Sequence, residues 1–280
     1  MVSVVIPFYK GNQYIPQLCE ILRKNAIALA TQCNVEMEVI FVNDSPDIEI
    51  VFPQKEDNIT VINNKVNCGI QKSRWTGIQH ASGEFILLLD QDDLIADDCI
   101  ASQYKAIQDC DFVVSNGYMT DSSGDSICLY KNEIEQRKVL NINFYYRCSN
   151  PIISPGQVLI RKECIPSIWG NINMRYHGAD DLFLWLLLLS DKHCKGTINP
   201  QKLYTHVFTG SNTSLNLELM EKSNLEVLEI MKDKMSIFNR FCFYRRTEYY
   251  AHLRDSIGYK ISYADVALMR FCYKRRIGRI

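Results

Sequence analysis

The sequence has no apolar run long enough to cross a bilayer. Its most apolar segment, residues 182–189, has eight residues, whereas a membrane-spanning helix needs about 20. The first residues are typical of a strand, so no secretory signal is expected there. Internal repeats and low-complexity tracts are also missing. These absences argue against a membrane-spanning helix, a secreted protein and a repeat array, and residues 182–189 are expected to form a buried helix.

Cysteine is abundant, but its spacing suits neither disulfides nor structural zinc. The 11 cysteines are scattered, with no CxxC pair and no cluster of cysteine and histidine at zinc-binding spacing. Many of them lie in apolar stretches, where a free thiol packs as a small hydrophobic group. We therefore expect a reducing, cytoplasmic compartment.

Size and charge indicate a globular protein with a basic tail. The 280 residues are 47% hydrophobic and 22% charged, which is enough for one large domain, or for a domain with a helical appendage. The net charge is −1, but residues 232–280 hold 12 lysines and arginines against 4 acidic residues, and the other 231 residues hold 19 against 28. A basic tail on an acidic body suggests an anionic surface as a partner.

Predicted strands alternate with predicted helices in the first part of the chain. Apolar and β-branched segments predict strands at 2–8, 37–42, 60–63 and 85–89, and helical spacing predicts helices at 15–29 and 71–81. Such alternation indicates an α/β fold, with a mostly parallel sheet flanked by helices, in which ligands bind at the carboxyl edge. The segments 7–9, 43–44 and 90–93, at the ends of three strands, would then converge on one cleft.

The later part of the chain is less regular. A helix is expected at 97–107, strands at 112–115, 157–161 and 202–208, a hairpin turn at 121–124 and the buried helix at 180–189. From residue 217 onward the pattern is helical and rich in tyrosine, phenylalanine and arginine. We therefore expect one α/β domain at 1–214 and a helical extension at 215–280.

Three carboxylates in four residues follow the predicted strand 85–89. Asp90 and Asp92 are separated by one residue, so in extended backbone their side chains share a face. Their mutual repulsion calls for a cation, and two hard oxygen ligands suit Mg²⁺ or Mn²⁺ that also carries a phosphate group. The alternative is a solvated acidic turn, in which Asp92 or Asp93 caps the next helix.

Five segments follow one another along the chain: SVVIPFYKGNQYI, FVNDSPD, NCGIQKSRWTGIQHASGEFILLLDQDD, GADDLFLW and YTHVFTGSNTS. In order and spacing they resemble the motifs of the inverting family 2 glycosyltransferases, which have the GT-A fold and use a nucleotide-sugar donor. In that order they are similar to the first strand and loop, the nucleotide-recognition turn, the central signature with its DxD metal motif, the acidic catalytic pair, and the loop that closes over the diphosphate. The resemblance covers residues 2–214 and implies a Rossmann-like GT-A fold. Two departures, Asp180 for the usual glutamate and Leu187 for a common arginine, bear on the acceptor side.

The resemblance implies donor-binding roles for four residues. Asp44 would accept the imide N–H of uracil, a good match for a carboxylate, although guanine also offers N–H donors and an Asx-type turn over 43–47 is the alternative. Pro7 would line the cleft through its carbonyl, and Tyr9 by stacking. Arg74 would contact the base or the diphosphate, or else be a solvated helix arginine.

The resemblance to family 2 also implies which residues bind the metal and which one acts as the base. Asp90 and Asp92 would hold the divalent ion between the donor phosphates, with His206 as a third ligand or a diphosphate contact. Asp181 would be the general base, because sugar hydroxyls are weak acids and attack at the anomeric carbon needs a carboxylate to take the proton. The alternative is that Asp180 and Asp181 cap their helix. The loop residues Ser211, Asn212 and Thr213 could donate to phosphate oxygens on closure.

The expected reaction is inverting transfer of a sugar from a UDP-sugar to a hydroxyl of a glycan or lipid-linked glycan, in surface polysaccharide biosynthesis. The aromatic and basic residues at 238–246 and 271–276 could lie on an anionic bilayer at the inner face of the membrane, or could belong to helices that pack on the sheet domain. No nucleic-acid-binding motif is present. Two rival functions remain open: a nucleotidyltransferase of the same fold, although only Lys10 supplies a basic group after the first strand, and a non-catalytic membrane-associated scaffold.

Overall fold

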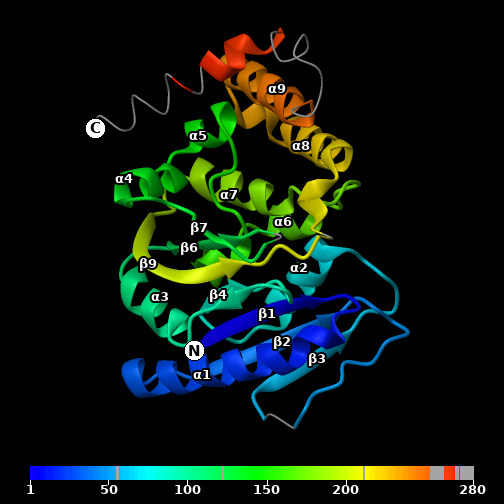
Figure 1. The fold of residues 1–280 in the computed structure, drawn as a ribbon, viewed down its shortest axis with the longest axis vertical. Coiled ribbons are helices and arrows are strands. Elements are labelled where there is room, and N and C mark those ends of the chain that lie inside the picture. The colour runs from blue at the N-terminus through cyan, green and yellow to red at the C-terminus, as the bar shows by residue number, and fades with distance from the viewer. Residues whose placement is uncertain (55–56, 122, 211, 253–261, 269–270, 272–280) are drawn as a thin grey trace.

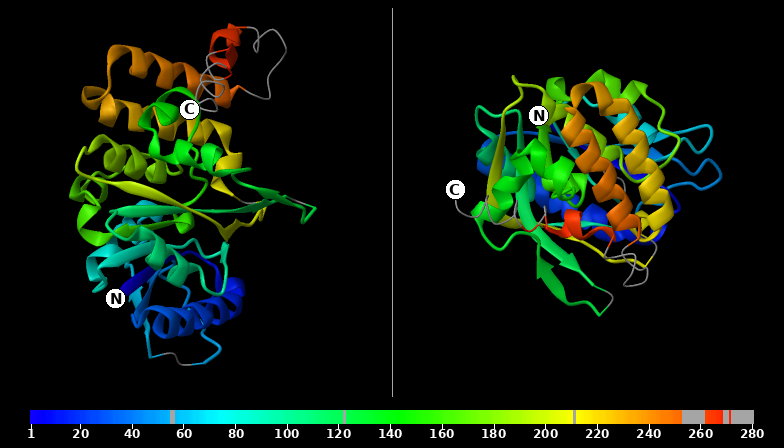
Figure 2. Two further views of the ribbon diagram at one scale, coloured as in Figure 1. Left: turned by 90° about the vertical axis from the view of Figure 1, so that its left-hand side faces the viewer. Right: turned by 90° about the horizontal axis from the view of Figure 1, so that it is seen from above.

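The computed structural model describes residues 1–54, 57–121, 123–210, 212–252, 262–268 and 271. One curled sheet runs through the middle of the molecule, and helices α8 (Leu217–Met231) and α9 (Ile237–Ala251) stack at one end (Figure 1). Seen from the side, helix α1 (Ile15–Cys33) and the first strands lie at the opposite end (Figure 2). The chain is an α/β protein, as its alternating pattern predicts.

In the described part of the chain, the sheet holds nine strands in the order β3-β2-β1-β4-β8-β6-β9-β5, with β7 paired to β6. The strands are β1 (Val2–Phe8), β2 (Met37–Asn43), β3 (Ile59–Asn63), β4 (Phe85–Leu88), β5 (Leu94–Ile95), β6 (Phe112–Thr120), β7 (Ser126–Cys128), β8 (Val158–Arg161) and β9 (Gly196–His206). The pairings make β1 to β4, β6 and β9 run in one direction, and β5, β7 and β8 in the other. The sheet is therefore mixed, with most strands parallel, as expected.

Two hydrophobic cores lie against opposite faces of the sheet. Val5 of β1 belongs to the core that contains helix α7 (Asp180–Ser190), whereas Val4 and Ile6 belong to the core that contains α1 and α3 (Cys99–Ile107). A strand covered by helices on both faces has no solvent-facing side. This explains why all seven residues of β1 are buried and why its sequence is nearly all apolar.

Helix α2 (Ile70–His80) lies close against β1 and carries polar residues toward the sheet edge. Gly77 makes the close approach possible, because a Cβ there would lie 2.2 Å from a methyl carbon of Val5. The remaining helices are short: α4 (Glu133–Gln136), α5 (Ile142–Arg147) and α6 (Ser167–Asn171). Helix α7 is buried along nearly its whole length, as its apolar run predicts.

The two C-terminal helices pack on the sheet domain. Val227 and Met231 of α8 and Phe243 of α9 belong to the same core as α7. The completely buried Ser223 of α8 accepts a hydrogen bond from the amide of Ala179 at 3.0 Å, directly before α7. The extension at 217–251 is thus part of the structure that holds α7 in place. Residues 272–276 of the expected basic stretch lie outside the described residues.

No helix in the described part of the chain is both long and apolar enough to span a membrane. The ten cysteines that the structure describes are free thiols.

Candidate active site

The site lies at the carboxyl edge of the parallel strands. β1 and β2 end in register, with Phe8 opposite Asn43, and the amide of Leu89 donates to the carbonyl of Val5 at 3.0 Å. The segments that follow β1, β2 and β4 therefore begin side by side. The structure brings the expected polar segments together at this edge.

Gln91 fastens the acidic turn after β4 to the loop after β1. Its side-chain amide accepts from the Tyr9 N–H at 3.0 Å and donates to the Tyr9 carbonyl at 2.9 Å. Gly11 leaves room for Gln91, because a Cβ there would lie 2.2 Å from Oε1. The Tyr9 side chain stays 46% exposed, as a stacking residue needs to be. Pro7 is buried within β1, opposite Val42.

Asp44 is buried and organises the loop that leads into α2. Its Oδ1 accepts from the side chain of Asn64 at 2.8 Å and from the amide of Cys68 at 2.7 Å, and its Oδ2 accepts from the amide of Gly69 at 2.8 Å. A carboxylate has about four acceptor positions, so three are taken. Asp44 thus has a clear structural task, and one remaining position with which to accept an N–H from a base.

Arg74 joins the acidic turn to the start of α7. Its side chain is 3% exposed and forms an ion pair with Asp90 through Nη2 and with Asp180 through Nη1, the latter at 2.7 Å. Burial alone would lower the pKa of Arg74, but the charges of Asp90 and Asp180 raise it above its ordinary value. The arginine is therefore a permanent cation between two carboxylates, rather than a solvated helix residue, and its contact with the donor stays a prediction.

Helix α2 also fixes the segment before α7. The side-chain amide of Gln71 donates to the carbonyl of Trp169 at 2.7 Å, and the indole N–H of Trp169 donates to the carbonyl of Asp180 at 2.7 Å. Trp169 meets Trp75 edge-to-face with ring centroids 6.3 Å apart. These contacts, together with Ser223 of α8, hold the beginning of α7 from two sides.

The two acidic residues at the start of α7 have different surroundings. Asp180 is buried against Arg74, whereas Asp181 accepts from the side chain of Asn150 at 3.1 Å and from the amide of Leu182 at 2.6 Å. Ala179, with no side-chain hydrogen bond, is the N-cap of the helix. Burial first, and then the charge of Asp180, raise the pKa of Asp181 to about 7. A carboxyl group with a pKa near neutrality is suited to proton transfer.

Asp93 is the best-anchored carboxylate of the acidic turn. It accepts from the hydroxyl of Tyr204, from the amide of Val207 at 3.1 Å and from the hydroxyl of Ser154 at 3.1 Å, and it pairs with His206 Nδ1 at 3.0 Å. Burial lowers the pKa of His206, but the hydrogen bond and charge of Asp93 raise it overall. Asp93 thereby ties the turn to the end of β9.

Asp90 and Asp92 offer the oxygens that a divalent ion needs. Asp90 uses Oδ1 for Arg74, and its Oδ2 has only a long contact of 3.4 Å with Ser154. Burial, followed by the charges of Asp93 and Asp90, raises the pKa of Asp92 to about 6, which reflects crowded negative charge. Among the described residues no three acidic, histidine or cysteine side chains form a ready metal cage. One or two carboxylates completed by substrate phosphates is the usual Mg²⁺ arrangement, so the residues fit such an ion.

Hydrogen bonds between its own residues stabilise part of the loop after β9. Asn212 accepts from the amide of Thr209 at 2.9 Å and donates to the carbonyl of Val207 at 3.2 Å. Thr213 begins a short turn that leads into α8, and Ser211 lies outside the described residues. His206 precedes this loop, and its Nδ1 is engaged by Asp93, which leaves Nε2 as the nitrogen available for a ligand.

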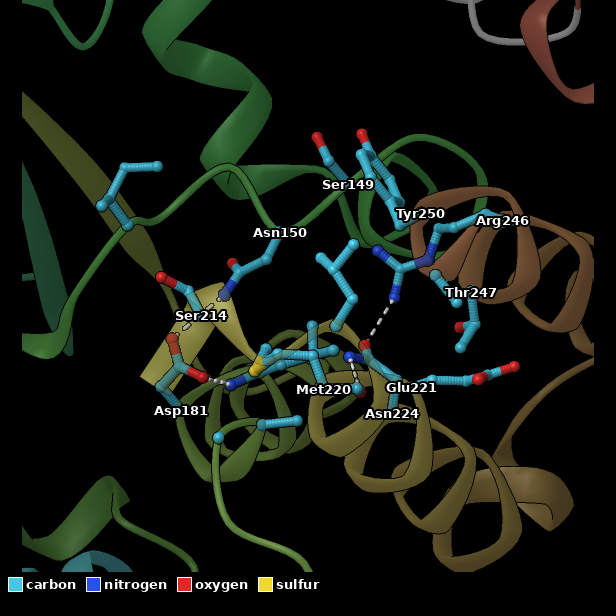
Figure 3. A pocket seen from close by; sticks show the side chains of 16 residues that line it. Ser149, Asn150, Asp181, Ser214, Met220, Glu221, Asn224, Arg246, Thr247 and Tyr250 are labelled. Carbon is cyan, nitrogen blue, oxygen red and sulfur yellow. Dashed lines mark hydrogen bonds between the residues drawn. The ribbon is translucent and has the colours of Figure 1, made fainter. Parts of the chain in front are cut away.

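A cavity of about 460 Å³ opens beside Asp181 (Figure 3). The loop that contains Ser149 and Asn150 and the start of α7 line it from the sheet domain, and α8 and α9 line it from the other side. Asp181 therefore has space next to it, while Asp180 faces the ion pair with Arg74.

Several residues of this site carry no sequence signal. Asn150 and Ser154 belong to the segment 118–176, which contains no recognisable motif, and Ser223 belongs to an ordinary amphipathic helix. Each of them acts through hydrogen bonds to residues far away in the chain. Only the fold reveals such pairs.

Comparison with known proteins identifies relatives. The family model "Glycosyl transferase family 2" matches residues 3–169. Over 206 residues the chain is 25% identical to "Glycosyltransferase GlyG" of Streptococcus pneumoniae serotype 4, a match that covers 68% of this chain and 66% of GlyG. The chain spans less than two thirds of the first three curated relatives, with 66%, 41% and 17% of their lengths matched.

Solved structures show the same fold. TarS of S. aureus in complex with UDP-GlcNAc aligns with a TM-score of 0.59 and 16% identity, over 95% of this chain and 79% of that one. The mannosyltransferase PcManGT of Pyrobaculum calidifontis, in complex with GDP-Man and Mn²⁺, aligns with a TM-score of 0.55 and 14% identity, over 95% of this chain and 73% of that one. At these identities the alignments speak for the fold alone, and they confirm the expected GT-A-like architecture.

Proposed function

Because the chain belongs to glycosyltransferase family 2, we propose that it transfers a sugar with inversion from a UDP-sugar to a hydroxyl of a glycan or lipid-linked glycan. The observation that carries this proposal is that Arg74 pairs with two of the acidic residues and leaves a third, Asp181, facing a cavity. Asp90 and Asp180 are bound to the arginine on one side, and Asp181 borders an open cavity on the other. Donor and acceptor would thus approach Asp181 from different directions, as single displacement requires.

The proposed step needs one base. The acceptor oxygen bonds to the anomeric carbon while the bond from that carbon to the diphosphate oxygen breaks, and the electron pair leaves with the nucleoside diphosphate. Asp181 takes the proton of the acceptor hydroxyl, and Asn150 orients its carboxylate. A divalent ion held by Asp90 and Asp92 would stabilise the charge of the leaving diphosphate.

The nucleotide is proposed to bind along the sheet edge between Tyr9 and Asp44. TarS, which has the same fold, binds UDP-GlcNAc, and this supports a uridine donor. PcManGT binds GDP-Man together with Mn²⁺, which supports a divalent ion and keeps guanosine as the second candidate. His206, through Nε2, is proposed as an additional metal or diphosphate contact.

A thermal-shift screen of UDP- and GDP-sugars with Mn²⁺ tests the donor. We expect a UDP-sugar to raise the melting temperature only when the metal is present, because ligands that bind the native state stabilise it. Asp92→Ala should lose this metal-dependent shift, since it removes a carboxylate that carries the ion.

The matched control is Asp109→Ala, which removes an exposed carboxylate after α3. It should keep the full shift. If no nucleotide-sugar stabilises the wild-type protein with any divalent metal, and no donor hydrolysis or transfer is detected, the non-catalytic scaffold becomes the better explanation. A nucleoside triphosphate that binds in place of the nucleotide-sugars would favour a nucleotidyltransferase.

The surface of α9 suggests where the acceptor is met. Ile237, Phe238, Phe241 and Tyr244 are 83%, 57%, 56% and 43% exposed and recur along one side of the helix. Arg240 lies among them, and Lys232 and Lys234 precede them. Exposed aromatic residues with basic neighbours suit the interface of an anionic bilayer. We propose that this surface contacts the inner face of a membrane, where a lipid-linked acceptor for surface polysaccharide synthesis would be found.

Co-sedimentation with vesicles checks the membrane contact. We expect binding to vesicles that contain phosphatidylglycerol, weaker binding to pure phosphatidylcholine, and loss of at least about tenfold in affinity in the double variant Phe238→Ser/Phe241→Ser, because each buried phenylalanine contributes about 1.5–3 kcal/mol. Ile127→Ser on β7, where Ile127 is 58% exposed, is the control and should bind as the wild type does. Equal binding by the double variant would contradict the contact.

A further inference from the structure

The cavity beside Asp181 is completed by the C-terminal extension. Its wall on that side comes from Met220, Glu221 and Asn224 of α8 and from Arg246 and Thr247 of α9 (Figure 3). Gly178, with φ of +121°, lets α8 come close, because a Cβ there would lie 2.6 Å from the sulfur of Met220. The helices thus form one side of the cavity, and the proposed base lies on its other side.

Arg246 places a cation at the wall of this cavity. Its side chain lines the cavity although the residue is only 3% exposed. The guanidinium lies over the ring of Phe243, with 4.2 Å from Cζ to the ring centre, and Nη2 donates to Asn224 Oδ1 at 3.4 Å. Figure 3 shows the guanidinium reaching from α9 toward Asn224 on α8. A planar guanidinium can bind a carboxylate or phosphate through two parallel hydrogen bonds.

Thr247 gives a second, independent sign of a ligand. It lines the same cavity, and the residue is 4% exposed. Within the part of the chain that the structure describes, its hydroxyl has no hydrogen-bond partner. A buried hydroxyl without a partner costs free energy unless a ligand or a water supplies one. Two adjacent polar residues of α9 therefore border the cavity, and a bound molecule could supply the hydrogen bond that the Thr247 hydroxyl lacks.

The charged groups around the cavity favour one class of molecule. Asp181 stands on the α7 side, and Arg246 and Glu221 stand on the side of the helices. Glu221 is half-buried, so water can solvate it, whereas Arg246 is buried. Arg246 is the one cation among these three groups, and a guanidinium binds oxyanions through charge-assisted hydrogen bonds. An oxyanion on the ligand is therefore expected to bind at Arg246.

We propose that this cavity is the acceptor subsite and that the acceptor carries an oxyanion, a phosphate or a carboxylate, which Arg246 binds. The reacting hydroxyl of the same molecule then lies at Asp181. Thr247 and Asn224 supply further hydrogen bonds on the side of the helices. This inference rests on the proposed function, because it assigns the acceptor of the same reaction.

Three probes with the same pyranose ring test the assignment: glucose, glucose 6-phosphate and glucuronate. Their affinities are measured by NMR titration of the full chain saturated with UDP and Mg²⁺, so that the donor phosphate site is filled. We expect at least one of the charged sugars to bind about tenfold or more tightly than glucose, since hydrogen bonds to charged groups are stronger than those between neutral groups. The charged sugar that binds more tightly distinguishes a phosphate from a carboxylate acceptor.

Arg246→Gln should remove this preference, and Arg246→Lys should retain part of it. Arg23→Gln, at an exposed position of α1, is the control and should leave all three affinities unchanged. UDP binding by each variant shows that it is folded. Equal or undetectable binding of the three probes to the UDP-loaded wild-type protein overturns the acceptor assignment, and so does a preference that survives in Arg246→Gln. Failure of the wild-type protein to bind UDP instead overturns the proposed function.

Discussion

Asp181→Asn is expected to reduce sugar transfer by about 10²–10⁴-fold, the usual contribution of a positioned general base, while UDP binding stays unchanged. Asparagine has the shape of aspartate and can still accept from Leu182, but its amide cannot take the proton of the acceptor hydroxyl. The donor side should be unaffected, because Arg74 is bound to Asp180 and Asp90 and does not depend on Asp181. Initial rates of transfer and a UDP titration measure the two effects.

The pH dependence adds a second readout for the same residue. The base acts as a carboxylate, and burial raises the pKa of Asp181 to about 7. The rate should therefore fall as pH drops below about 7, and this limb of kcat/KM against pH should be absent from the residual activity of Asp181→Asn. The raised pKa also means that the stability this group contributes at low pH is lost as pH rises from about 4 through about 7. The asparagine variant should consequently be at least as stable as the wild type at pH 8.

Asp191→Asn is the matched control, because Asp191 is exposed at the other end of α7. It should retain the wild-type rate and pH profile. Full transfer by Asp181→Asn would remove Asp181 as the base, and a simultaneous loss of UDP binding would show that the residue serves the donor side instead.

Arg74→Met is expected to lower the free energy of unfolding by about 3–5 kcal/mol, the cost of removing one partner from a buried ion pair. Without the guanidinium, the buried Asp180 and the half-buried Asp90 would be left as unpaired like charges between the acidic turn and α7. Urea denaturation measures the loss in stability. Metal-dependent UDP binding should weaken as well, because Asp90 would lose the contact that fixes its carboxylate.

Adding Asp180→Asn to Arg74→Met should recover part of the stability, since it removes one of the two unpaired charges; such coupling is what a double-mutant cycle measures. Arg23→Met, at an exposed position of α1, should change stability by no more than about 0.5 kcal/mol. If Arg74→Met is as mild as Arg23→Met, the ion-pair bridge does not organise the site.

The sequence was sufficient to predict what depends on local pattern. The strand β1 matches its expected bounds, and the polar segments at the strand ends meet at one edge because parallel strands bring their carboxyl ends together. The strand β9 was expected only from residue 202 but begins at Gly196. Its first half lacks apolar alternation, and its pairing with β6 has register shifts at Asn116. Where strand pairing is irregular, apolar and polar residues do not alternate along the strand, and the prediction depends on that alternation.

The sequence did not predict the contacts between segments that are distant in the chain. The alternative of a solvated Arg74 was wrong, because the side chain is buried and pairs with two carboxylates, one of them 106 residues away in the chain. The Asx-turn alternative for 43–47 applies to Asn43, whose Oδ1 accepts from the amide of Ser45, whereas Asp44 binds the amides of Cys68 and Gly69. The wall that α8 and α9 add to the cavity depends on helix packing, which an amphipathic pattern does not specify.

We propose that the carboxylates have separate roles, with Asp92 serving the donor and Asp181 serving the acceptor. Isothermal titration of UDP into the wild type, Asp92→Ala and Asp181→Asn, each with and without Mn²⁺, tests this division most directly. The wild type and Asp181→Asn should bind UDP equally well and only with the metal, whereas Asp92→Ala should show no gain from it. Metal-dependent binding that survives in Asp92→Ala, or disappears in Asp181→Asn, would contradict the account.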